Sequence, residues 1–246
     1  MRGLNAFQLK LIMALLMVLD HLDRIPGLVP PAWAAAFHAL TRCVGPCFAY
    51  LAVEGFVHTR SRLRYNLRLF GWAALMAAGN ALYHMLGASK GLYISNNIFF
   101  TLALGVLMLN ILEQGRNTPH RGKKVLCIGG VAAVLVLGAV LAEGGIIVLP
   151  FMLTAYVLRD RVALRNGLWL AGSAVLLALS YVPYPTRFET LVMLGYNSDF
   201  LFVLAIPFLM LYNGERGPKT AASKYLFYGF YPLHLWVIGL LALAVA

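Results

Sequence analysis

The stretch Lys10-Leu-Ile-Met-Ala-Leu-Leu-Met-Val-Leu-Asp-His21 is apolar between its basic start and its Asp-His end. An α-helix turns by about 100° per residue, so the side chain of His21 comes to within about 20° of the side chain of Lys10. The two residues then lie about 16 Å apart along the helix axis. We therefore expect one transmembrane helix with an ammonium group near the cytoplasm and an imidazole about half a bilayer deeper on the same face.

The composition extends this expectation to the whole chain. Of the 246 residues, 61% are hydrophobic and only 12% are charged, and the mean hydropathy is +0.78. A soluble globular protein has about twice this charged fraction. The sequence therefore predicts an all-α, polytopic bundle of transmembrane helices, with residues 1–246 forming one integral membrane domain.

Apolar segments of helical length divide the chain. They cover residues 7–22, 43–57, 69–87, 97–112, 125–142, 145–158, 167–182, 191–212 and 225–245. Each is counted as one span, which gives about nine transmembrane helices. The long connection at residues 23–41 is expected to be a polar segment on the outside.

The basic residues indicate how these spans are oriented. With a cytoplasmic N-terminus, the inside segments hold all but four of the 20 Lys and Arg residues, as the positive-inside bias requires. The four on the other side are Arg24, Arg42, Lys90 and Arg187. The net charge of +11 is thus explained by topology, and no soluble basic domain is present that would predict a nucleic-acid partner.

The cysteines do not predict a metal centre. Cys43, Cys47 and Cys127 lie within or at the ends of apolar segments. Cys43 and Cys47 have helical spacing, but a metal site needs further ligands beside them. We expect all three thiols to serve in packing, and no metal to be bound.

Ionisable side chains within the spans are candidates for a functional site, because each costs a few kcal/mol to insert. At about 1.5 Å per residue, His21, His234 and Asp199 fall at similar depths and can converge in one layer. Asp20 is adjacent to His21 and points about 100° away, so Asp199 is the better predicted partner for orienting the imidazole. In the simpler alternative, His21 caps a helix end and bonds a neighbouring carbonyl.

Positive charge gathers on the expected cytoplasmic side, where His58 is followed by Arg60, Arg62, Arg64 and Arg68. Arginine forks match phosphate oxygens, so this cluster is a candidate phosphate site together with Lys10. It serves equally well as a positive-inside signal that faces anionic membrane lipid.

A second inside segment joins the candidate donor site. It contains Tyr212, Asn213 and Arg216, with turn chemistry at Asn-Gly. Phosphates at the wet end and a reactive group at the buried end describe a long ligand such as acetyl-CoA.

Two polar residues are predicted to face an acceptor from the outer side. Arg42 opens the second apolar segment and Asn97 opens the fourth. The alternatives are that Arg42 anchors its helix at the interface and that Asn97 caps its helix.

Several ordered motifs resemble those of the TraX family over nearly the whole chain. They are Leu9-Lys10 to Leu19-Asp20-His21, Arg42 with Pro46-Cys-Phe-Ala, Glu54-Gly-Phe with His58-Thr-Arg, Asn97-Ile-Phe-Phe-Thr, Tyr212-Asn-Gly-Glu-Arg-Gly and Phe230-Tyr-Pro-Leu-His234. The resemblance implies acetylation of the N-terminal amine of a pilin subunit in the inner membrane. The family also resembles the wider transmembrane acyltransferases, whose first helix carries a basic residue and a histidine at the spacing of Lys10 and His21. Glu54 stands where the O-acetyltransferases carry serine, so no role is carried over to it.

These observations predict an acetyltransferase of the bacterial inner membrane that uses cytosolic acetyl-CoA. His21 is the expected general base, or transiently carries the acetyl group, and Asp199 or His234 orients it. The acceptor is an amine of a pilin-like peptide or a hydroxyl of a cell-envelope glycan. The alternative is a small transporter or assembly factor without catalysis, although the internal repeats and paired broken helices typical of transporters are not evident.

Overall fold

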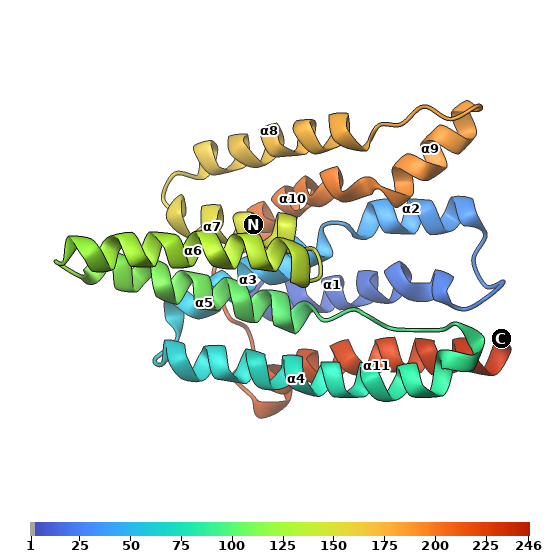
Figure 1. Cartoon of the computed structure of the whole chain (residues 1–246), viewed down its shortest axis with the longest axis horizontal. Coiled ribbons are helices and arrows are strands. Elements are labelled where there is room, and N and C mark those ends of the chain that lie inside the picture. Colours follow the sequence, from blue (N-terminus) through green and yellow to red (C-terminus); the bar gives the residue numbers. More distant parts are fainter. Residues whose placement is uncertain (1–2) are drawn as a thin grey trace. The chain divides into compact units, whose positions relative to one another are not determined.

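The computed structural model describes residues 3–246, except for the side chain of Lys224. This part of the chain is helical throughout, with no strand and one isolated bridge between Leu4 and Tyr212 (Figure 1). The predicted all-α class is confirmed.

The helices follow one another with short connections. In chain order they are α1 (Ala6–His21), η1 (Leu22–Arg24), α2 (Pro31–Thr41), α3 (Val44–His58), α4 (Arg62–Gly87), η2 (Ala88–Lys90), α5 (Ile98–Asn117), α6 (Arg121–Leu141), α7 (Gly145–Val157), α8 (Val162–Ser180), α9 (Arg187–Tyr196), η3 (Ser198–Leu204), α10 (Ala205–Leu211) and α11 (Ala221–Val245).

The expectation for residues 23–41 was wrong, because most of this segment is helical. Pro31 occupies the first turn of α2, where a missing N–H costs nothing. The alanine-rich sequence that follows favours a helix. The expectation of a non-apolar external connection overlooked the helical propensity after Pro31.

A break also divides the segment predicted as one span at residues 191–212. The helix α9 and the η3–α10 stretch meet at 61°. The bend is that of a broken span or a re-entrant loop, neither of which was predicted from the sequence.

Five helical stretches in the described residues are long and apolar enough to cross a membrane, and the count rises to six if the bent pair forms one span. They include α6 and α8, in each of which only 11% of the most apolar window is buried by the rest of the protein. Exposed side chains such as Leu137 and Val140 on α6 are those expected to face lipid. The chain is a helical membrane protein.

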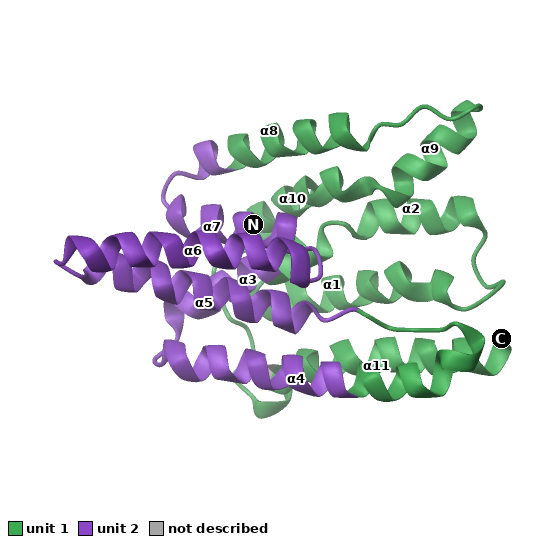
Figure 2. Ribbon diagram, in the orientation of Figure 1, with its two compact units in different colours: residues 1–48, 79–95, 166–246 green, residues 49–78, 96–165 purple. Residues whose placement is uncertain are grey.

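The chain forms two compact units, each assembled from distant segments (Figure 2). Unit 1 contains residues 1–48, 79–95 and 166–246, and unit 2 contains residues 49–78 and 96–165. The assignment of residues 1–246 to one domain stays a prediction.

In unit 2, glycines let neighbouring helices approach closely, as is typical of membrane helix pairs. A Cβ on Gly105 of α5 would meet the sulfur of Met152 on α7, and one on Gly138 of α6 would meet the end of the Leu149 side chain. The ends of the Met152 and Leu149 side chains thus fill the space that the two glycines leave.

Candidate functional site

The site in unit 1 is built on α1 and α11, which lie side by side and run in the same direction (Figure 1). Near their starts, the Phe7 and Phe227 rings are 5.6 Å apart and Lys10 Nζ is 5.7 Å from the Phe227 ring centroid. Further along, the rings of His21 and His234 are 5.5 Å apart. Lys10 and the two imidazoles thus lie one after the other along the pair formed by α1 and α11.

The two imidazoles are stacked and buried. Their planes differ by 24°, and His21 and His234 are only 6% and 7% exposed. The His234 ring also stacks on the Phe230 ring, with 5.2 Å between the ring centroids. It packs edge to face with the Tyr231 ring, with 5.6 Å between the centroids. Aromatic packing therefore fixes the orientation of the His234 ring.

The tautomer of His234 follows from its hydrogen bond. Nδ1 lies 3.1 Å from the carbonyl oxygen of Phe230, and a carbonyl can only accept, so Nδ1 carries the proton. In the neutral ring the lone pair is then on Nε2. Within residues 3–246, this Nε2 is buried and has no hydrogen-bond partner. A buried lone pair held in this way can accept a proton.

Beside the imidazoles lies a network of charged residues from η1, α1 and α2. The Asp20 carboxylate accepts hydrogen bonds from His38 Nδ1 at 3.1 Å and Arg42 Nη2 at 3.3 Å, and another from the Thr41 hydroxyl. His38 Nε2 lies 2.8 Å from a carboxylate oxygen of Asp23. Both ring nitrogens of His38 therefore face carboxylates, and Nδ1 also lies 3.0 Å from Arg42 Nη2.

This network changes the pKa of Asp23, which lies outside the membrane-spanning segments. Its partial burial acts to raise the pKa of the Asp23 carboxyl, but the hydrogen bond from His38 and the charges of His38 and Arg24 outweigh burial. The pKa of Asp23 is therefore lowered from its ordinary value, and the carboxylate stays ionised at neutral pH.

The predicted contact between Asp199 and His21 is not formed in the described part of the chain. Instead, Asp199 lies 3.3 Å from Arg42 Nη1 and its side chain is 55% exposed. The nearer carboxylate is Asp20, 3.8 Å from His21 Nδ1. The angular argument against Asp20 failed because His21 ends α1 with φ −118° and ψ 1°, outside helical geometry.

At the other end of α1, the loop that contains Tyr212, Asn213 and Arg216 lies against the start of the helix. The amide N of Leu4 donates to Leu211 at 2.7 Å, and that of Asn213 donates to Leu4 at 2.9 Å. Arg216 is close enough for its charge to act on Lys10. The structure thus brings together four of the predicted donor-site residues, about 16 Å along α1 from His21.

Comparison with known proteins assigns the chain to a family. Residues 6–242 match the family described as TraX protein. This chain belongs to the TraX family. The probable fimbrial assembly protein FimC, serogroup H1, of Dichelobacter nodosus is 25% identical over 241 residues, which cover 94% of this TraX chain and 93% of that protein. No solved structure matches the chain.

The remaining predicted donor-site residues of this TraX chain lie in unit 2. Arg62 pairs with Glu113 at 3.3 Å and lies 4.5 Å from the Phe56 ring centroid. His58 Nδ1 donates to the Glu54 carbonyl at 2.9 Å. Arg60 and Arg64 are exposed, whereas Arg62 is half-buried. The first two are therefore more accessible to a ligand.

Asn97, predicted either to cap α5 or to bind an acceptor, is an N-cap. Its side-chain oxygen accepts from the amide of Phe100 at 3.2 Å, and its amide donates to Ala73 at 2.9 Å. The Asn97 backbone N–H donates to Glu143 at 2.6 Å. These three hydrogen bonds give Asn97 a structural role within unit 2.

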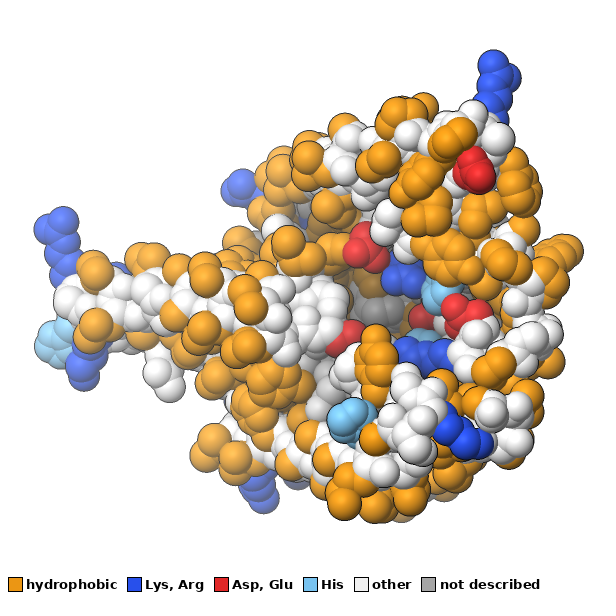
Figure 3. Space-filling view, turned by 45° about the vertical axis from the view of Figure 1, so that its right-hand side comes forward, with side chains coloured by type: hydrophobic (Ala, Val, Ile, Leu, Met, Phe, Trp, Pro, Cys, Tyr) orange, Lys and Arg blue, Asp and Glu red, His pale blue; other side chains and the backbone are white. Residues whose placement is uncertain are grey.

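Sequence reasoning missed His38, Thr41 and Arg24. The first two lie in α2, where His38 precedes Thr41 by three residues and Arg42 by four, the spacings of neighbours on one helical face. Figure 3 shows acidic, basic and histidine side chains gathered on one face among hydrophobic side chains. Recognising α2 after Pro31 would have pointed to His38.

Proposed function

We propose that this TraX-family protein is an integral membrane acetyltransferase that moves an acetyl group from acetyl-CoA to the N-terminal amine of a pilin-like peptide. The observation that carries the proposal is the buried His234 Nε2, which holds an unshared lone pair and is stacked against His21. The name of the relative FimC, a probable fimbrial assembly protein, supports an acceptor of the pilin type.

Acetyl-CoA, the proposed donor, fits along the surface that α1 and α11 form together. Lys10 and Arg216 supply positive charge for the phosphates, and Phe227 offers an aromatic surface beside Lys10. The pantetheine arm then follows α1 for about 16 Å to the imidazoles. A thioester at His21 and His234 is removed from bulk water.

The chemistry requires a proton acceptor at the reacting amine. The amine nitrogen attacks the thioester carbonyl, the carbon–sulfur bond breaks, and the thiolate of CoA leaves. His234 Nε2 takes the proton that the amine loses, and this proton then goes to the thiolate. His21, with Asp20 3.8 Å from its Nδ1, is the second imidazole in reach of the same proton. Arg42 and His38 hold Asp20 in place.

CoA binding tests the donor assignment. By calorimetry in detergent, Lys10→Ala and Arg216→Ala should each weaken CoA binding by about 10- to 150-fold, because hydrogen bonds to charged groups contribute about 1.5–3 kcal/mol. Raised salt should weaken binding further, because exposed charges are screened. Arg60→Ala and Arg64→Ala test the cluster in unit 2.

Arg187→Ala, at an exposed arginine of α9, is the matched control and should bind CoA like the unchanged protein. Well-folded protein that does not bind CoA would remove the donor from the proposal. That result would favour the second candidate, a non-catalytic transporter or assembly factor, for which the broken α9–η3–α10 helix is the supporting feature.

We also propose an inner-membrane location with a cytoplasmic N-terminus and an external C-terminus. The nine predicted spans exceed the five or six long apolar stretches of the described residues and stay a prediction. An alkaline phosphatase fused after Ala246 should be active, because this enzyme folds only outside the cytoplasm, whereas the basic segments retain the opposite ends of the spans inside. Activity of a cytoplasmic reporter alone at this position would contradict the orientation and require an even number of spans.

A further inference from the structure

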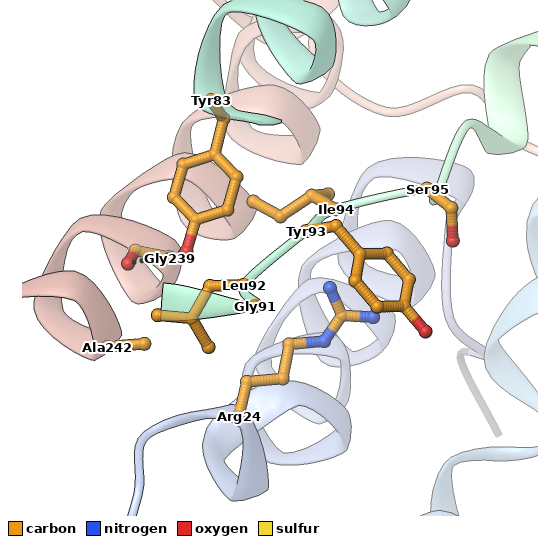
Figure 4. Close-up of a pocket in the computed structure, with 9 residues that line it drawn as sticks. All are labelled: Arg24, Tyr83, Gly91, Leu92, Tyr93, Ile94, Ser95, Gly239 and Ala242. Carbon is orange, nitrogen blue, oxygen red and sulfur yellow. Dashed lines mark hydrogen bonds between the residues drawn. The ribbon is translucent and has the colours of Figure 1, made fainter. Parts of the chain in front are cut away.

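A cavity of about 330 Å³ lies within unit 1 (Figure 4). Its lining includes Arg24, Tyr83, Tyr93, Ser95, Gly239 and Ala242. In Figure 4, the Arg24 side chain rises from η1 toward the segment that carries Tyr93, and Tyr83 and Gly239 lie across from it. The cavity is thus bordered by η1, the end of α4, the segment after η2, and α11.

One wall of the cavity is preformed. The hydroxyl of Tyr83 donates to the carbonyl of Gly239 at 3.0 Å. A Cβ at Gly239 would lie 2.8 Å from Ile94 and from the Tyr83 ring, so glycine is needed for this close packing. The space is therefore built by fixed contacts between α4, α11 and the segment that carries Ile94.

The cavity lies beyond the imidazoles, on the side away from Lys10. Along α11, Gly239 and Ala242 follow His234 by about 7.5 Å and about 12 Å. Arg24 follows His21 directly through η1. Neither imidazole lines the cavity, which thus lies past them, at the end opposite to the predicted CoA phosphates, and a bound peptide must extend from it toward His21 and His234.

The charge of the lining selects the kind of group that binds. Arg24 is the charged side chain among the described lining residues, and a guanidinium binds a carboxylate with two parallel hydrogen bonds. The charge of Arg24 also acts on His21 and His234. The same positive charge would favour the neutral, nucleophilic form of an amine bound beside them.

We propose that this cavity is an acceptor subsite that binds the carboxylate of an acidic residue near the N-terminus of the peptide to be acetylated. An extended peptide advances by about 3.3 Å per residue, so the acidic residue follows the reactive one by about two to four positions. The inference rests on the proposed function, which it extends by naming the class of acceptor sequence.

The test measures peptide binding without acetyl-CoA. The probes are the synthetic peptide Ala-Ala-Ala-Asp-Ala-Ala-amide with a free amine and the same peptide with Asn in place of Asp. By calorimetry in detergent, the Asp peptide should bind about 10- to 100-fold more tightly, as expected for a hydrogen bond to a charged group. Arg24→Gln should abolish this difference, and Arg187→Gln should retain it.

Two results would overturn the subsite: equal binding of the two peptides by the unchanged protein, or an unchanged preference in folded Arg24→Gln. The first needs no variant, so the test holds even if Arg24→Gln fails to fold. Acetyl transfer to the peptides, measured separately by mass spectrometry, distinguishes the two proposals. Tighter binding of the Asp peptide without acetyl transfer supports the subsite and contradicts the proposed acetyltransferase. Acetyl transfer without any preference for the Asp peptide supports the acetyltransferase and contradicts the subsite.

Discussion

Acetyl transfer by the His234→Ala protein is expected to fall by at least about 100-fold, because general acid–base catalysis contributes about 10²- to 10⁴-fold. His21→Ala should cause a loss of similar size. The affinity for CoA should stay within a few-fold in both, because the phosphate end of the site is about 16 Å away along α1. Initial rates with acetyl-CoA and a free-amine peptide give the measurement.

The two imidazoles are expected to act as a unit. The double variant should therefore be little slower than the worse of the single ones. His84→Ala, at an exposed histidine of unit 1, is the matched control and should keep normal turnover. Lys10→Ala should raise the KM for acetyl-CoA more than it lowers kcat. A folded His234→Ala protein with near-normal turnover would return the role of base to His21.

Loss of Asp20 is expected to have the largest effect on stability. In Asp20→Ala, His38 and Arg42 each lose a hydrogen bond to the same carboxylate. Removing one partner of a buried ion pair costs about 3–5 kcal/mol, and the partial exposure of this network reduces the expected loss to about 2–3 kcal/mol. Thermal unfolding in detergent, followed by tryptophan fluorescence, measures it.

Asp20→Asn should be milder, because an amide oxygen still accepts hydrogen bonds although the charge is gone. Asp160→Ala, at an exposed carboxylate of unit 2, should unfold like the unchanged protein. If Asp20→Ala melts at the same temperature as the Asp160→Ala control, the network does not stabilise unit 1.

The sequence was informative where a feature is local. Helical periodicity and apolar length identified α1, and the repeat of the helix placed Lys10 and His21 on one face. The depth argument also brought His234 to the level of His21, and the two rings do stack. The first of these expectations depends only on the rise and rotation of a single helix, and the match of His234 with His21 also needs the orientation of the two spans.

The sequence alone did not show which side chains on different helices contact one another. Asp199 was assigned to His21 by depth, but depth does not specify the angle around a helix, and α2 places Arg42 next to Asp199. His38 went unnoticed because its helix was taken for a loop. The pairing of His38 with Asp20 and Asp23 depends on how α1, η1 and α2 fold together.

The parallel packing of α1 and α11 sets the order of events during biosynthesis. His21 enters the membrane with the first helix, whereas His234 arrives with the last. The stacked imidazoles therefore form only after α11 has been made and inserted, and every nascent chain that lacks α11 lacks half of the pair. The pair of imidazoles on which the proposed chemistry depends is therefore incomplete until α11 has been inserted beside α1.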